Sequence, residues 1–323
     1  MAEDYIYAVT RIHIREKYML NRLEMDSLAS AKSLQEALGL LAAKGWETSL
    51  VSGRDVEPLI NREYEKTWAL AAEAAGEIKE LDMLRKTRDF HNLKAAIKLV
   101  YTGGLEQNQT QYFMEYGLIP LSRIVKAAET RDFAQLPGYM PDAGEKAWKA
   151  LVDTGNGQLC EAIVDCAALE QLDAEGKASK SPLLRQYALF TVDMGNIQAA
   201  VRCCLLKHKR DFMEYVIARG GSLDKEGLIC AALGSEAEID KFLRDTPYAG
   251  AAALSPGAFA RWRSDGIIRM IRPQRRAISG VEPLVAYILA RENEISMARL
   301  ILGSKAAGVS GSSVKERLGL TYA

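Results

Sequence analysis

This sequence of 323 residues carries no net charge, because its 42 basic side chains are balanced by 42 acidic ones. Neutrality argues against nucleic acid as a general partner, since binding to phosphates requires a surplus of Lys and Arg. No run of 18 or more apolar residues occurs, so we expect no direct span of a lipid bilayer. The N-terminal stretch MAEDYIYAVTRIHIREK is charged throughout and lacks the apolar centre of a signal peptide. We therefore expect a cytoplasmic protein.

Metal-binding and catalytic motifs are missing as well. The five cysteines show no CxxC spacing and the three histidines are scattered, so we predict no metal site and expect buried free thiols. The sequence has no glycine-rich phosphate-binding loop, no GxSxG and no HExxH. We therefore predict no cofactor and no catalytic residue, and this absence favours a protein that is not an enzyme.

The pattern that is present is helical. Aromatic residues make up only 7% of the chain, whereas Ala and Leu are abundant, which favours helix over sheet. Apolar residues recur at helical spacing, and the alternation typical of strands never persists beyond four or five residues. The sequence predicts an all-α protein whose helices, each about 10–25 residues long, pair as antiparallel hairpins.

Two helical stretches share one signature. Residues 89–98 read DFHNLKAAIK and residues 193–202 read DMGNIQAAVR, an offset of 104 residues. The same offset pairs Gly117 with Gly221, and a weaker third copy, RENEISMARLILGSK, lies at residues 291–305. Repetition at a fixed spacing indicates a repeated structural unit, here of roughly 100 residues and present three times.

The aspartates of this signature have a predicted local role. Asp is a preferred N-cap, because its short side chain accepts hydrogen bonds from backbone N–H groups of the first helical turn. We predict that Asp89 and Asp193 are structural helix caps, with Asn92 and Asn196 near the third helical position as a weak capping box. In the third copy Arg291 replaces the Asp, so that helix is expected to start earlier and run through.

The third unit is predicted to be split between the two chain ends. Two stretches share one spacing of a cap, an acidic residue and two large apolar residues: Ser33, Glu36, Leu41 and Trp46, and Ser235, Glu238, Leu243 and Tyr248. The N-terminal stretch therefore resembles the second half of a repeat. The small and charged segment 173–182 is the best linker candidate. We predict three domains: residues 1–70 with 286–323, residues 71–177, and residues 178–285.

One segment, RWRSDGIIRMIRPQRR (261–276), is densely basic. Arginine binds carboxylates through paired hydrogen bonds and is enriched at protein interfaces. The segment is either a partner-binding surface or a solvated loop held by the chain's own acidic residues. The interface candidates are its six arginines: Arg261, Arg263, Arg269, Arg272, Arg275 and Arg276.

The C-terminal stretch from Pro283 to Ala323 resembles the closing signature of the C subunit of prokaryotic V-type (A-type) ATPases, the counterpart of the d subunit in eukaryotes. The shared positions are Glu294–Ile295, Arg299, Lys305 to Gly308, Glu316–Arg317–Leu318 and Tyr322. The opening is similar too, in Tyr5, Tyr7, Ala8 and Arg11 followed by SLASAKSLQEALGLL. Met297 stands where the family often has Asn, and residues 130–180 match only in their pattern of helices.

The resemblance implies a funnel of three similar helical domains with pseudo-threefold symmetry, one of them built from both chain ends. It implies a non-catalytic socket, peripheral on the cytoplasmic face of the membrane, that passes torque during ATP-coupled transport of H⁺ or Na⁺. The implied partners are the coiled-coil subunit of the central stalk, its small companion, and the membrane rotor ring.

Two other interpretations stay open at this point. A cytosolic helical-repeat adaptor would bind another protein in a concave face, but such repeats are typically about 34–45 residues long, which is well below the period found here. An enzyme with an unrecognised all-α active site would need a cluster of polar residues, for which the sequence offers no constellation.

Overall fold

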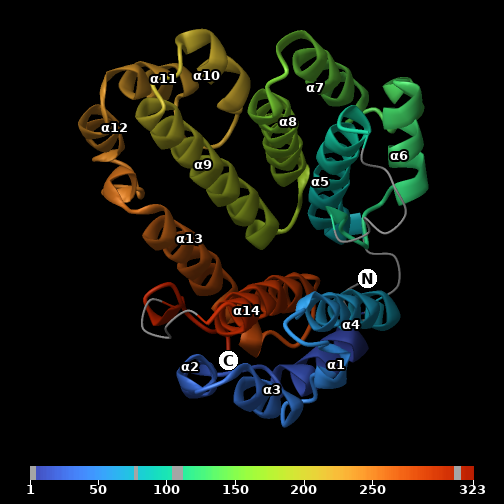
Figure 1. The fold of residues 1–323 in the computed structure, drawn as a ribbon. Helices are drawn as coiled ribbons and strands as arrows, with labels where there is room; N and C mark the ends of the chain where they lie inside the picture. Colours follow the sequence, from blue (N-terminus) through green and yellow to red (C-terminus); the bar gives the residue numbers. More distant parts are fainter. Residues whose placement is uncertain (1–4, 76–78, 104–111, 309–313) are drawn as a thin grey trace. The chain divides into compact units, whose positions relative to one another are not determined.

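The computed structural model describes residues 5–75, 79–103, 112–308 and 314–323 (Figure 1). This part of the chain forms fourteen α-helices and several short 3-10 helices, and it contains no β-strand. The prediction of an all-α fold is confirmed. Across the described ranges, no helix has both the length and the hydrophobicity needed to cross a bilayer. The chain divides into two compact units, which we call unit 1 and unit 2.

Unit 1 comprises Met1–Ile78 and Ser255–Ala323, so both chain ends contribute to it. Its helices are α1 (Ile6–Glu16), α2 (Arg22–Ser30), α3 (Leu34–Ala42), α4 (Glu57–Ala75), α13 (Pro256–Ile271) and α14 (Glu282–Ala306), with 3-10 helices η2 (Thr48–Leu50) and η7 (Arg272–Arg276). Helix α14 packs against α1, α4 and α13. Its Ile295 and Leu302 join Leu28, Leu41 and Leu59 of α2, α3 and α4 in one apolar core.

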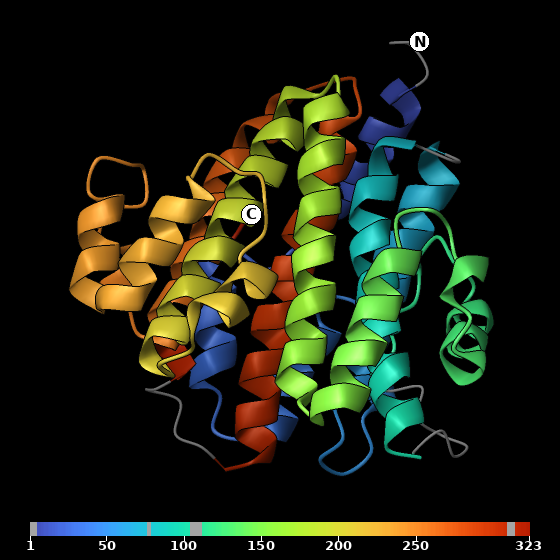
Figure 2. The same cartoon turned by 90° about the horizontal axis from the view of Figure 1, so that it is seen from above.

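Unit 2 comprises Lys79–Leu254. Its helices are α5 (Asp82–Tyr101), α6 (Leu121–Thr130), α7 (Pro141–Thr154), α8 (Gly157–Ala178), α9 (Pro182–Leu205), α10 (Arg210–Val216), α11 (Lys225–Gly234) and α12 (Glu236–Leu243), with 3-10 helices η3 (Lys79–Leu81), η5 (Phe133–Gln135) and η6 (Ala251–Ala253). Helix α8 packs along both α5 and α9 (Figure 2). Phe90, Ile97, Ile124 and Val164 belong to one apolar core of α5, α6, α7 and α8.

Several helix starts lie where their caps predict them. The hydroxyls of Ser33 and Ser235 accept hydrogen bonds from backbone N–H groups three residues on, at 3.1 and 3.3 Å. Ser181 caps α9 in the same way. The predicted linker at 173–182 is wrong, because α8 continues to Ala178. Gly176 is small for a packing reason, since a Cβ there would lie 2.3 Å from the Cβ of Ala188 on α9.

The asparagines of the repeated signature make the same contacts in both copies. The amide of Asn92 donates to the carbonyl of Met114 at 2.8 Å and accepts from the N–H of Met114 at 2.7 Å. Asn196 exchanges the same pair of hydrogen bonds with Ala218, at 3.0 and 2.8 Å. Met114 and Ala218 are again 104 residues apart. The repeat therefore extends to the residues whose backbone groups bind the two asparagines, although the side chains of these residues differ.

The prediction that Asp89 and Asp193 are helix N-caps is wrong. Helices α5 and α9 begin at Asp82 and Pro182, so both aspartates lie inside them, and both are fully buried. Their carboxylates instead bind a distant turn that leads into the next helix. Asp89 accepts from the N–H groups of Leu118 and Ile119, both at 3.2 Å. Asp193 accepts from the equivalent residues of its own copy, Ser222 and Leu223.

A tyrosine completes each of these buried clusters. Tyr139 donates its hydroxyl to Asp89 at 3.0 Å, and Tyr248 donates to Asp193 at 2.7 Å. Burial raises the pKa of Asp89, although the hydrogen bonds to its carboxylate act in the opposite direction. We call each Asp, with its Asn and Tyr, a buried clamp, because it ties a long helix to a turn about 30 residues away.

Glycine is required beside each clamp. A Cβ on Gly117 or on Gly221 would lie 2.2 Å from a carboxylate oxygen of Asp89 or Asp193. Gly221 also has a φ of +75°, which other residues adopt only with strain. Gly117 and Gly221 therefore occupy equivalent positions of the repeat because the carboxylate of Asp89 or Asp193 lies too close to the backbone there for a side chain to fit.

In the third copy the same positions carry different chemistry. Helix α14 starts nine residues before Arg291, as predicted, but α5 and α9 also start well before their aspartates, so the missing Asp is not the reason. Glu294, at the Asn position, accepts from the N–H of Leu20 at 2.9 Å. Arg291, at the Asp position, donates to Glu63 at 2.7 Å and to Glu294 at 2.8 Å. The Trp46 ring lies 5.5 Å from the Arg291 guanidinium, where the other copies have a tyrosine. The division into three domains stays a prediction.

Candidate functional site

The predicted basic segment forms most of α13 and all of η7 in unit 1. Arg261 and Arg269 each lie 3.9 Å from the carboxylate of Asp265. Arg263 and Arg276 make no hydrogen bond or ion pair with any described residue, and Arg276 is exposed. The remaining candidates, Arg272 and Arg275, donate hydrogen bonds to backbone carbonyl groups near the chain's own C-terminus.

That C-terminal tail, residues 314–323, is anchored by several side chains. Five of them donate to its carbonyl groups and one accepts from its backbone: Arg22 to Gly319, Arg261 to Glu316, Arg272 to Thr321, Arg275 to Tyr322, Asn293 to Leu320, and Asp265 from Leu320. Leu318, Thr321 and Tyr322 are buried. Much of the basic segment therefore makes intramolecular contacts, mostly with carbonyl groups of the tail and, through Arg261 and Arg269, with Asp265.

The two halves of the basic segment are expected to differ in their effect on stability. Replacing both Arg272 and Arg275 with Ala should lower the free energy of unfolding by about 1–3 kcal/mol, because both carbonyl partners of the tail lose a charged donor. Replacing Arg263 and Arg276 with Ala should change it by less than about 0.5 kcal/mol. Denaturant unfolding of the two double variants measures this, and equal losses would contradict the anchoring role.

His13 joins α1 to the end of the basic segment. Its Nδ1 lies 2.8 Å from the Glu16 carboxylate and its Nε2 lies 2.9 Å from the carbonyl of Ala277. Both partners are acceptors, so both ring nitrogens donate and the imidazolium form is favoured. Burial acts to lower the pKa of His13, but these hydrogen bonds outweigh it and raise the pKa above 6.5.

A small pH dependence of stability follows from His13. A raised folded-state pKa gives stabilisation that is complete below the unfolded pKa of about 6.5 and is lost as the pH rises through the folded pKa. We expect the free energy of unfolding to fall over that window in the wild type. The fall should be reduced in His13→Gln, as measured by denaturant titrations at several pH values. An unchanged pH profile in the variant would contradict this assignment.

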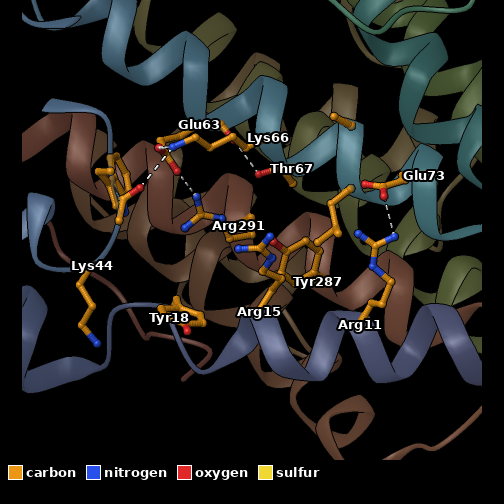
Figure 3. A pocket seen from close by; sticks show the side chains of 14 residues that line it. Arg11, Arg15, Tyr18, Lys44, Glu63, Lys66, Thr67, Glu73, Tyr287 and Arg291 are labelled. Carbon is orange, nitrogen blue, oxygen red and sulfur yellow. Dashed lines mark hydrogen bonds and ion pairs between the residues drawn. The ribbon is translucent and has the colours of Figure 1, made fainter. Parts of the chain in front are cut away.

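A cleft of about 500 Å³ lies in unit 1, lined by α1, α4, α14 and the turn after α3 (Figure 3). Arg11, Arg15 and the nearby Tyr18 line it from the α1 side. Tyr287 and Arg291 line it from α14. We call it the α1 cleft. Sequence reasoning missed it, and the available signal was the four-residue spacing of Arg11 and Arg15 along α1, with Tyr18 just beyond the helix.

Basic residues outnumber acidic ones in the α1 cleft, with five basic and two acidic lining residues, a net charge of +3. Arg11 pairs with Glu73 of α4 at 2.9 Å, and this hydrogen bond lowers the pKa of Glu73. Lys66 pairs with Glu63 and Lys44 pairs with Glu24. Arg15 is exposed and makes no ion pair with any described residue. Arg15 therefore leaves one cation available to an anionic group, whereas the other four basic lining residues are already paired.

The five cysteines differ in their exposure to solvent. All five are free, and Cys160, Cys166 and Cys203 are buried as expected. Burial raises the pKa of Cys160 and Cys203 to about 11, which makes them weak nucleophiles. The expectation of burial is wrong for Cys204, which is half-buried, and for Cys230, which faces solvent on α11. Within the described ranges, no group of three or more His, Cys, Asp or Glu residues is placed to hold a metal ion.

The matching family model and the similar proteins point to the same protein family. Residues 8–317 match the ATP synthase (C/AC39) subunit family. A similar protein is the C subunit of the V-type sodium ATPase of Enterococcus hirae, 22% identical over 317 residues, which cover 95% of this chain and 96% of that protein. The C subunit of the A-type ATP synthase of Haloferax volcanii is 25% identical over 250 residues, covering 71% of this chain and 70% of that protein. Its counterpart in the A-type ATP synthase of Halorubrum lacusprofundi is 25% identical over 253 residues, covering 72% and 71%. The C/AC39 protein is a non-catalytic subunit of V- and A-type ATPases, and this chain belongs to its family.

Proposed function

We propose that this chain is the socket subunit of the central rotor in a V- or A-type rotary ATPase. In this role it joins the central stalk to the membrane rotor ring and transmits torque for ATP-coupled transport of H⁺ or Na⁺. The observation that carries the proposal is the family match over residues 8–317. The relatives are named as C subunits of a sodium ATPase and of ATP synthases, which agrees with a place in such a complex.

The physical requirements of torque transmission support the same proposal. A protein that passes a rotation on must do so without deforming, so its helices need fixed attachments to one another. Asp89, Asp193 and Arg291 provide such attachments, since each ties the middle of a long helix to a chain segment distant in sequence. Close-packed interiors transmit strain because they are nearly incompressible.

The arrangement of domains and partners is part of the proposal. Three helical domains, comprising residues 1–70 with 286–323, residues 71–177 and residues 178–285, would form a pseudo-threefold funnel peripheral on the cytoplasmic face of the membrane. A body with near-threefold symmetry can seat on a ring of identical subunits through several individually weak contacts. The coiled-coil stalk subunit and its small companion would bind the funnel as well.

Co-purification tests this proposal. The wild-type chain is expressed with the stalk subunits and the rotor ring of the same organism, and the recovered complex is analysed for stoichiometry. We expect one complex that contains the chain, the stalk and the ring. Recovery of a folded, helical chain without either partner would overturn the proposal and favour a helical-repeat adaptor. The Arg263→Ala/Arg276→Ala variant shows whether the arginines outside the tail contacts contribute to assembly.

A further inference from the structure

Helix α1 packs one side into unit 1 and presents the other side to solvent. Ala8, Val9 and Ile12 bury one side of the helix in the core. The opposite side exposes Tyr7 by 65% and, beyond the helix end, Tyr18 by 57%. Large aromatic side chains exposed to this degree are typical of protein interfaces, because burying them on binding contributes substantial free energy.

The exposed charges that α1 itself contributes to this surface are basic. The exposed residues from Ile6 to Tyr18 include Arg15 and Lys17 but no Asp or Glu, and the nearby Glu16 is half-buried and bound to His13. Arg15 lines the α1 cleft next to Arg11, and Tyr18 lines the same cleft. Tyrosine and arginine side by side at a cleft are the residue types that dominate binding energy at interfaces.

We propose that the exposed face of α1 and the α1 cleft together form a docking surface for an acidic segment of a neighbouring protein, with a carboxylate entering the cleft beside Arg15. The guanidinium of Arg15 matches a carboxylate, which it can bind through two parallel hydrogen bonds. Tyr18 covers the apolar part of the entering side chain. Glu73 already occupies Arg11, so Arg15 supplies the charge that selects the partner.

A protein segment fits these observations better than a lipid surface. Exposed aromatic and basic residues on a helix also suit an anionic bilayer. However, Arg15 and Tyr18 line a recess of about 500 Å³, with Tyr287 and Arg291 among its other lining residues. A recess of this size accepts one or two side chains, and the exposed aromatic rings beside it suit the apolar part of a protein segment. The inference rests on the proposed function, because the partner is taken to be a neighbour in the ATPase complex.

Charge reversal at Arg15 is the direct test. We expect Arg15→Glu to weaken incorporation of the full chain into the stalk–ring complex by at least tenfold, and Arg15→Gln to weaken it less. Tyr18→Ala is expected to act in the same direction. The matched controls lie in unit 2: Arg244→Glu makes the same charge change at an exposed residue, and Tyr215→Ala removes a tyrosine exposed by 55%. Both controls should behave as wild type.

The partner is then identified by cross-linking. A photoreactive side chain at position 18 in the assembled complex should link to a segment that contains Asp or Glu. Changing that carboxylate residue to Lys should restore incorporation of Arg15→Glu. If wild type assembles and Arg15→Glu assembles within twofold of it, the inference is wrong and the proposed function stands. If wild type itself fails to assemble, both are wrong.

Two further experiments test whether a lipid surface or a small anion binds at the docking surface instead of a protein segment. The full chain is mixed with vesicles that contain phosphatidylglycerol, and separately titrated with inorganic phosphate. We expect neither to bind in an Arg15-dependent way. Vesicle binding that Arg15→Glu abolishes would show a lipid-facing surface. Phosphate binding that Arg15→Glu abolishes, with assembly unchanged, would show a site for small anions. Either result would overturn the inference.

Discussion

The Arg291→Met variant is expected to lose about 3–5 kcal/mol of unfolding free energy, because it leaves the buried carboxylate of Glu294 without a cation and that of Glu63 with Lys66 alone. Glu63 and Glu294 are each 3% exposed, and Arg291 donates to both. Methionine preserves much of the apolar volume beside Trp46, so the loss reports charge rather than packing. Denaturant unfolding at neutral pH measures it.

The pH dependence of this loss shows whether it comes from the missing positive charge or from altered side-chain packing. Burial raises the pKa of Glu294, and removing Arg291 removes a group that acts to lower it. A carboxyl group with a raised folded pKa adds stability as the pH falls and loses it as the pH rises through that pKa. The deficit of Arg291→Met should therefore shrink towards acidic pH.

Arg299→Met on the same helix is the control, since its pair with Glu57 is exposed and should contribute less than about 1 kcal/mol. A similar small loss in both variants would contradict the buried-charge account.

Asp193→Ala is expected to lower the unfolding free energy by about 3 kcal/mol or more. The substitution removes the acceptor shared by the N–H groups of Ser222 and Leu223 and the hydroxyls of Ser222 and Tyr248. A buried polar group that loses its partner costs about 1–3 kcal/mol, and the lost carboxylate also leaves its buried position unfilled. Asp89→Ala should show a comparable loss, because it orphans two N–H groups and one tyrosine hydroxyl in the same geometry. Thermal or denaturant unfolding checks both.

The matched control is Asp165→Ala on α8. Asp165 is also in unit 2, but its side chain is 57% exposed and pairs with Lys94 at the surface, so we expect a loss below about 1 kcal/mol. If Asp89→Ala and Asp193→Ala were no more destabilising than Asp165→Ala, the buried clamps would not be the attachments that torque transmission requires.

The repeat could be predicted from the sequence because the same contacts restrict the same positions in both copies. Gly117 and Gly221 are fixed by the close approach of a carboxylate, and Asn92 and Asn196 by one pair of backbone hydrogen bonds. The role of Asp89 and its counterpart could not be predicted, because an Asp before a helical run looks the same whether it caps that helix or binds a turn elsewhere. Only a partner about 30 residues away distinguishes the two.

The candidate sites were less predictable. The basic segment is visible in the sequence, but Arg272 and Arg275 bind backbone carbonyls of the tail, and carbonyl groups leave no trace in a sequence. The α1 cleft depends on α14, whose Arg291 is about 270 residues from Arg15 along the chain. A charge pattern along the chain cannot show which helices will meet.

We propose that this protein couples ATP hydrolysis to ion movement as a non-catalytic subunit. The most direct measurement compares ATP hydrolysis and ion uptake by the complex in sealed vesicles, with and without the chain. We predict that removing the chain abolishes ion uptake while the catalytic head still hydrolyses ATP, and that adding it back restores uptake. Ion uptake that persists at the same rate without the chain would contradict the account.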